Sequence, residues 1–311
     1  MESVSLVADE KPLDEVGTGR TPIALHAGWA AVLALACMAP AMATAAESDA
    51  ELAKKMANPV AALISVPMQY NYDDGLGPRE KGEMQTLVVQ PVIPIEINDD
   101  WNLISRTVVP LIDQQNIVRN GLLDETGLGD ITQSLFFSPK APTASGWIWG
   151  AGPVLLLPTA SEDLLGSNRW GLGPTAVVLK QTNGWTVGML ANHIWSVGGG
   201  GHDYDFENLP PLFSTVLGIS SPEDDISATF LQPILSYATK TSTTFSLNTE
   251  STYDWKGEQW TVPVNLAVSQ LLRLGGQPLS VQVGVRYWAN APEFGPEDWG
   301  FRFAVTLLFP K

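Results

Sequence analysis

Segments of about ten residues with alternating character recur along this chain, and they limit its possible folds more than any other feature. The clearest of them runs from Ala62 to Asp73. Every second position there is apolar or aromatic, at Ile64, Val66, Met68, Tyr70 and Tyr72. A helix would scatter these side chains around its axis, whereas a strand places them all on one face. The pattern therefore indicates β-structure with one apolar face and one polar face.

The same pattern predicts twelve strands over most of the chain. They are expected at residues 62–73, 84–97, 101–113, 129–138, 147–159, 173–181, 185–197, 226–238, 243–255, 259–271, 278–290 and 299–309. No segment after the N-terminal region offers the run of about 18 apolar residues that a transmembrane helix needs. The predicted fold class is therefore all-β.

The lengths of the connections alternate, which is a second and independent indication. Connections after even-numbered strands are mostly short, as at 98–100, 182–184 and 239–242, and most of the others are longer, as at 74–83, 114–128, 160–172 and 198–225. Short turns at one end and long loops at the other are typical of bacterial outer-membrane barrels. We therefore expect a transmembrane antiparallel β-barrel of about 12 strands, with both termini in the periplasm.

Aromatic residues gather at the expected strand ends, as barrels require where the wall crosses the lipid headgroups. They include Tyr70, Tyr72, Trp101, Trp147, Trp149, Trp185, Trp195, Tyr253, Trp255, Trp260, Tyr287, Trp288 and Trp299. The alternative is a soluble β-sandwich or lipocalin-like barrel with these rings in its core. The apolar face extends over too many strands for a sandwich of this length, which favours the membrane barrel.

The N-terminal region predicts export. An apolar run from Ala27 to Met38 precedes small residues at 41–46, so residues 1–45 are expected to be a signal peptide. Its acidic start at 1–20 suggests that translation begins further downstream, near Val16. An anchor helix and a lipoprotein cleaved before Cys37 are the alternatives. Cys37 is the only cysteine, so the remaining chain can form neither disulfides nor cysteine metal sites.

After the signal peptide we expect a periplasmic lead at 46–61, followed by the barrel at 62–311. Residues Glu51 to Met56 read ELAKKM and predict a short helix within the lead. This helix could plug the periplasmic mouth or form a mobile lead, and the second interpretation is favoured because chain ends are commonly mobile.

Alternation also identifies the side chains that should line the lumen. These lumen candidates are Gln69, Arg106, Asn248, Glu250, Asp254, Asn265, Gln282, Arg286 and Arg302. An arginine facing lipid at mid-membrane would cost about 2–4 kcal/mol, which favours the inward assignment. Arg286 and Arg302 opposite Glu250 could form a constriction that selects what passes, or an ion-paired network that only fills the lumen. Both interpretations stay open.

The sequence gives little support for catalysis or for a cofactor. His193 and Ser196 fall on opposite faces of a regular strand, so we expect no catalytic residues and no enzyme, and His193 is expected at the interface beside Trp195. The loop at 198–225 is acidic but lacks metal-ligand spacing. We therefore expect neither a metal nor a cofactor. A formal net charge of −16 argues against a nucleic-acid partner.

Several short motifs resemble a known family. They are Asn58-Pro59-Val60, Leu63 to Pro67, Gln90 to Pro94, Asn98 to Thr107, Gly127 to Ile131, Trp170 to Pro174, Asn192 to Val197 and Phe230 to Pro233. Together they are similar to the outer-membrane proteins grouped under the meta-pathway of phenol degradation, which are labelled as transporters. The resemblance covers the chain from about residue 50. It implies an outer-membrane barrel and suggests uptake of small compounds, with aromatic compounds as the candidates.

These observations predict a passive outer-membrane pore or transporter for small aromatic or hydrophobic molecules. The alternative is a structural or ligand-binding barrel that acts through its extracellular loops. The expected partners are outer-membrane lipid, a small-molecule substrate and the outer-membrane assembly machinery. Phe309 lies close enough to the C-terminus to serve as the aromatic signal for that machinery.

Overall fold

The computed structural model describes residues 48–117, 124–199 and 225–310. The expected signal peptide at 1–45, Cys37 within it, and most of the acidic loop at 198–225 lie outside these residues. Within the described part, no helix has the length and apolar character needed to span a membrane.

The first described element is an α-helix, α2 (Asp49–Met56), which matches the expected short helix. Ser48 caps it by accepting a hydrogen bond from the backbone N–H of Glu51. Acidic residues in its first turn and Lys54 and Lys55 in its last turn complement the helix dipole.

Fifteen strands of one antiparallel sheet follow within the described residues. They are β1 (Ile64–Leu76), β2 (Gly82–Val89), β3 (Val92–Glu96), β4 (Trp101–Gln115), β5 (Glu125–Leu128), β6 (Ile131–Pro139), β7 (Trp147–Leu157), β8 (Arg169–Thr182), β9 (Trp185–Gly199), β10 (Ser227–Ala238), β11 (Thr243–Thr249), β12 (Ser251–Asp254), β13 (Gln259–Leu274), β14 (Gln277–Asn290) and β15 (Trp299–Phe309). A 3₁₀ turn, η2 (Asp163–Leu165), lies between β7 and β8.

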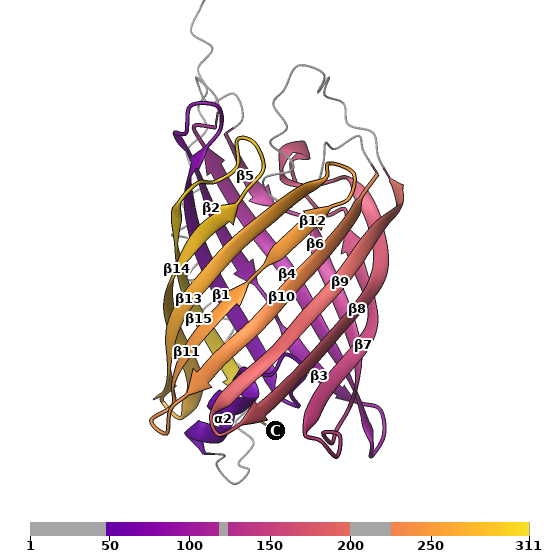
Figure 1. Ribbon diagram of the computed structural model, residues 1–311, viewed down its shortest axis with the longest axis vertical. Coiled ribbons are helices and arrows are strands. Elements are labelled where there is room, and N and C mark those ends of the chain that lie inside the picture. Colours follow the sequence, from indigo (N-terminus) through magenta and orange to yellow (C-terminus); the bar gives the residue numbers. More distant parts are fainter. Residues whose placement is uncertain (1–47, 118–123, 200–224, 311) are drawn as a thin grey trace, which may run out of the picture. The chain divides into compact units, whose positions relative to one another are not determined.

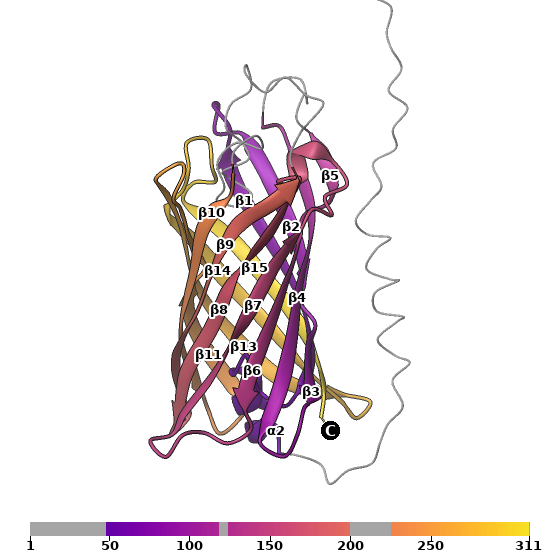
Figure 2. The ribbon, with the colours of Figure 1, turned by 90° about the vertical axis from the view of Figure 1, so that its right-hand side faces the viewer.

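The sheet closes on itself as an antiparallel barrel, which confirms the predicted fold class. β1 pairs with β15, from Ile64 opposite Phe309 to Tyr72 opposite Phe301, and β9 pairs with β10 over its length. Each crossing of the barrel wall is called a stave here. Figures 1 and 2 show the staves tilted steeply around the barrel.

The 15 strands form 12 staves because three staves are interrupted. The predicted strand 84–97 breaks into β2 and β3 at Gln90-Pro91, and 243–255 breaks into β11 and β12 at Glu250. β5 and β6 are separated by Gly129-Asp130. Prolines explain two of these breaks: Pro91 has no N–H to donate, and neither has Pro263, whose carbonyl accepts from the Glu250 N–H. The sequence predicted the number of crossings but not the interruptions.

The two ends of the barrel differ. At one end, called here the helix end, lie α2, the end of β15 and short turns such as 183–184 and 275–276 (Figure 1). The longer connections, including 77–81 and 158–168, lie at the opposite end, called here the loop end. The alternation of loop lengths seen in the sequence therefore corresponds to two distinct ends.

The outward face of the barrel is apolar. Leu266 is 55% exposed and Val283 50%, although both are in the middle of long strands. Aromatic rings pair near both ends, with Trp185 against Tyr237 at 4.9 Å and Tyr287 against Trp299 at 5.0 Å. A wide apolar belt between aromatic pairs suits a hydrocarbon environment.

Trp288 is an exception to the predicted aromatic girdle. Its indole N–H donates to a carboxylate oxygen of Asp73 at 2.8 Å, inside the barrel. The register between β13 and β14 shifts between Val262 and Pro263. That irregularity is not needed to turn Trp288 inward, because Trp288 shares the parity of Gln282 and Arg286 along β14. The girdle prediction included it only because aromatic residues gather at the strand ends.

The inward face has two unlike walls. An apolar wall, formed on β4 and β6–β9, consists of Ile104, Phe136, Val177, Leu179 and Leu190, and Val60 from the segment after α2 packs against it. The polar wall, on β1 and β11–β15, carries buried Asn71, Asp73, Asn265, Arg286 and Arg302. The lumen is therefore amphipathic across its width.

Helix α2 is docked at the helix end. Leu52 is fully buried and packs with Leu63, Leu271 and Leu308. Arg273 binds Asp49 at 2.6 Å, and the Gln181 side chain donates to the carbonyl of Lys54 at 2.8 Å. These contacts fit a plug of the mouth, whereas the sequence favoured a mobile lead. The docking depends on inward residues of distant strands, which no local pattern reveals.

Candidate functional site: a constricted lumen

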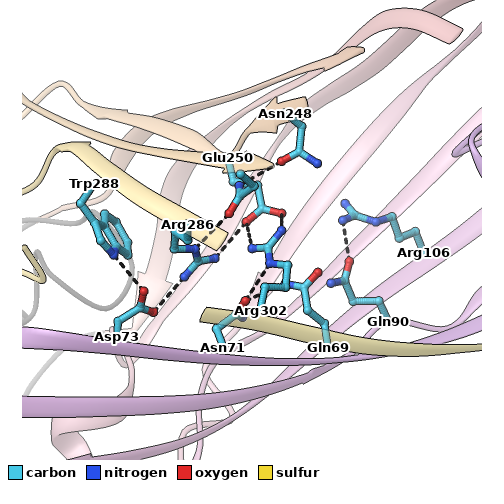
Figure 3. A network of polar contacts seen from close by, with 11 residues as sticks. Gln69, Asn71, Asp73, Gln90, Arg106, Asn248, Glu250, Arg286, Trp288 and Arg302 are labelled. Atoms are coloured by element: carbon cyan, nitrogen blue, oxygen red, sulfur yellow. Dashed lines mark hydrogen bonds and ion pairs between the residues drawn. The ribbon is translucent and has the colours of Figure 1, made fainter. Parts of the chain in front are cut away.

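Glu250 is the centre of a charged network on the polar wall (Figure 3). Arg302 donates to both of its carboxylate oxygens, at 3.1 and 2.7 Å, and Arg286 donates to one of them at 3.2 Å. Glu250 reaches these partners from the break between β11 and β12, while Arg286 is on β14 and Arg302 on β15. The bonds therefore run along one wall, rather than across the lumen as an opposed constriction would require.

The two arginines of this network have most of their donors engaged. Arg286 also binds Asp73 at 2.9 Å and Asn265 at 3.2 Å, and the Arg302 Nε donates to Asn71 at 2.8 Å. The Arg286 guanidinium lies 5.2 Å from the centre of the Trp288 ring. Two buried cations thus share two carboxylates, which makes their burial tolerable and fixes their positions.

Two cavities occupy the lumen. The helix-end cavity, of about 270 Å³, lies against the segment Lys55–Pro59, and the loop-end cavity, of about 330 Å³, extends past Glu250 and Trp288. Gln90, Arg106 and Gln232 line both cavities, so they are called here the septum. Arg106 donates to the side-chain oxygen of Gln90 at 2.8 Å. The septum is therefore the place where the two cavities meet.

The loop end is narrowed by the β7–β8 connection. Asp130 is 2% exposed, and its carboxylate accepts from the backbone N–H groups of Thr159, Ala160 and Ser167 and from the Ser167 hydroxyl, at 2.6–3.2 Å. Leu165 of the same connection is fully buried against Leu76, Met84, Ile112 and Ile117. Asp130 therefore fixes this loop over the mouth of the barrel.

The lumen candidates from the sequence all occupy inward positions. Gln69 lines the loop-end cavity, and Asn248 and Gln282 line the helix-end cavity. Asn265 donates to Asn248 at 2.9 Å. Asp254 is buried near the loop end, where it accepts from the N–H of Lys256 at 2.9 Å. The structure brings Glu250, Arg286, Arg302 and Asn265 together, and it holds Arg106 and Asp254 apart from that cluster. Their role as a substrate pathway stays a prediction.

Five residues of the site were not among the sequence candidates. Asn71 and Asp73 share the alternation of Gln69, so the same argument could have included them. Gln90 and Asp130 lie at strand breaks, where alternation does not apply. Gln232 occupies an inward position of β10, but nothing else in the neighbouring sequence sets it apart. Their importance depends on contacts between strands that are distant in the sequence.

His193 lies outside the lumen. Its ring is 4.1 Å from that of Trp195, as expected for an interfacial residue, and its Nδ1 lies 2.7 Å from the hydroxyl oxygen of Thr229. Ser196 instead binds Asp225 and the N–H of Ile226. His193 and Ser196 thus have different partners.

No protein-family model matches this chain, and no curated protein shows significant similarity to it. Solved structures do match. An outer membrane channel from Pseudomonas putida F1 is 15% identical, with a TM-score of 0.57 over 80% of this chain and 96% of the channel. The NanC porin is 10% identical, with a TM-score of 0.44 over 78% and 98%. The likeness to the Pseudomonas putida channel shows that this chain has the fold of an outer-membrane barrel.

The expectation that this protein is not an enzyme was wrong as an exclusion. Outer membrane phospholipase A from Escherichia coli is also among the matched structures, at 11% identity and a TM-score of 0.44 over 80% of this chain and 90% of the enzyme. Barrels of this kind thus include an enzyme as well as channels. That expectation depended on the spacing of His193 and Ser196, which bears on one possible arrangement of catalytic residues and on no other.

Proposed function

We propose that this protein is a passive outer-membrane pore for small molecules. The observation that carries the proposal is the pair of cavities along the lumen, which meet at the septum of Gln90, Arg106 and Gln232. The apolar outward belt supports placement in a membrane, and the short turns at the helix end support a periplasmic position for that end and for both termini. A signal peptide at 1–45 would deliver the chain for insertion.

The lining supports small cargo with apolar character. The loop-end cavity, of about 330 Å³, is at the lower limit of common ligand sites, and Val88, Val108, Phe230 and other apolar residues line much of it. This favours small hydrophobic or aromatic molecules over large polar solutes. The association with phenol degradation is supported by the sequence resemblance alone.

The first test is whether the purified protein is a folded barrel that conducts ions. We expect unboiled protein to migrate differently from boiled protein in a detergent gel, and the folded form to produce discrete single-channel currents in planar bilayers. A heat-modifiable barrel without any current would contradict the pore, and it would favour a structural or ligand-binding barrel that acts through its loops.

A second test locates the path. Gln232→Trp places an indole at the septum, whereas Leu235→Trp places one on the outward face of the same strand, where Leu235 is 38% exposed. We expect Gln232→Trp to reduce the single-channel current strongly and Leu235→Trp to leave it unchanged. Equal currents in both variants would show that ions do not pass the septum.

A further inference from the structure

Arg106 differs from the other two lumen arginines in its partners. Arg286 and Arg302 each bind a carboxylate, whereas Arg106 donates one hydrogen bond to the neutral side chain of Gln90. Within the described residues, no carboxylate oxygen lies within ion-pair distance of Arg106. Figure 3 shows its guanidinium separate from the Glu250 network. Arg106 therefore has no direct ion-pair partner among the described residues, and the carboxylate that acts on it electrostatically, Glu250, is already bound by Arg286 and Arg302.

The remaining donors of Arg106 are accessible from the cavities. A guanidinium has five N–H groups, and those of Arg106 beyond the bond to Gln90 are not sealed in protein, because Arg106 lines both cavities. None of its nitrogens is among the buried polar atoms that lack a partner. A group entering from either cavity can therefore reach the charge.

The electrostatic surroundings favour an anion there. The described residues that line the helix-end cavity include Lys55 and Arg106 but no acid. In the loop-end cavity the two acids are already engaged, Glu250 by two arginines and Asp130 by the loop at 158–168. A bidentate contact with carboxylate is the geometry that a guanidinium prefers.

Apolar side chains surround the same position. Val92 and Leu190 line the helix-end cavity, while Val108 and Phe230 line the loop-end cavity. Val92 is the strand partner of Arg106 across the β3–β4 ladder. A ligand held by Arg106 would therefore place its remaining atoms against an apolar surface, as in most small-molecule sites.

We propose that Arg106 forms a binding site in the septum for small monocarboxylates with an apolar body. The guanidinium would bind the carboxylate, and the apolar lining on either side would take the hydrocarbon part. The proposal rests on the proposed pore because it names the molecules that the pore would carry. Binding at Arg106 itself does not require conduction. The site would make Arg106 the residue that determines specificity.

The test is calorimetric titration of the folded, detergent-solubilised protein with hexanoate, acetate, 1-hexanol and hexylammonium. We expect binding of hexanoate, weaker binding of acetate because it lacks the apolar body, and no measurable binding of the alcohol or the amine. Arg106→Gln should weaken hexanoate binding by roughly ten- to a hundredfold, the range for a hydrogen bond to a charged group. Arg106→Lys should retain part of the affinity. Lys140→Gln is the matched control, because it removes a cation that pairs with Glu96 and lines neither cavity.

Equal affinity for hexanoate and 1-hexanol in the wild-type protein would overturn the proposal even if Arg106→Gln did not fold. Unchanged hexanoate affinity in folded Arg106→Gln would overturn it as well. Single-channel recording separates this inference from the pore. Conduction without carboxylate binding leaves the pore and rejects the site, whereas binding without conduction supports the site and rejects the pore.

Discussion

Neutralising Glu250 should destabilise the barrel, because two buried arginines bind this carboxylate. In Glu250→Gln, Arg302 loses the one carboxylate that it binds in the described part of the chain and keeps Asn71, while Arg286 keeps Asp73. The two arginines then share one carboxylate, so one positive charge is unbalanced. Their side chains are only 4% (Arg302) and 10% (Arg286) exposed. The perturbation therefore removes one partner from a buried pair.

The size of the effect follows from that burial. Removing one partner of a buried ion pair costs about 3–5 kcal/mol. The Glu250 side chain is 23% exposed to the cavity, so water offsets part of the cost, and the glutamine oxygen can still accept one hydrogen bond. We therefore expect a loss of about 3 kcal/mol in the free energy of unfolding.

The assay is reversible urea unfolding of the protein in lipid vesicles, followed by tryptophan fluorescence and by gel mobility. Glu258→Gln is the matched control, since Glu258 is exposed in the turn between β12 and β13. Adding Arg302→Gln to Glu250→Gln should recover part of the loss, because the unbalanced cation is removed. A loss below about 1 kcal/mol in Glu250→Gln would refute the reasoning, since the network would then contribute no more than a surface pair.

Three further changes test other parts of the barrel. Asp130→Asn should release the loop at 158–168, with faster hydrogen exchange in that loop and a larger single-channel current, and unchanged exchange would contradict its role. Leu52→Ala should weaken the docking of α2 by about 2–5 kcal/mol in free energy and raise the rate at which the helix is proteolysed. Equal proteolysis rates in the variant and the wild type would mean that this contact does not hold the helix. Gly173→Ala should lower the folded yield on gels, because the added Cβ would overlap the His193 carbonyl oxygen. Gly198→Ala has open space around its Cβ and should leave the yield unchanged, and equal yields of the two variants would argue against this β8–β9 register.

The number of crossings and the inward face could be predicted because alternation is a local property of the backbone. Ser280, Gln282 and Arg286 point inward for the same reason that Val281, Val283 and Val285 point outward. The breaks at Gln90-Pro91 and Glu250 were harder to predict from the sequence. A proline marks a missing donor, but whether a stave breaks there depends on the partner strand, as Glu250 opposite Pro263 shows.

The contacts that shape the lumen could not be predicted, because they join segments that are distant in the sequence. Asp73 meets Arg286 and Trp288 across more than two hundred residues, and Leu52 meets Leu271 and Leu308. The inward fold of the β7–β8 loop depends on one buried carboxylate, Asp130. Each contact follows from the closure of the barrel, and closure places together strands that no window along the chain compares.

Passage of solutes through the septum is tested most directly by thiol modification during single-channel recording. The measurement uses a Cys37→Ser background, in which Gln232→Cys or Leu235→Cys provides a single thiol. We predict that a charged, membrane-impermeant thiol reagent reduces the current stepwise through Gln232→Cys and leaves Leu235→Cys unaffected, because Gln232 lines both cavities and Leu235 faces outward. An unaltered current through fully modified Gln232→Cys would contradict the claim.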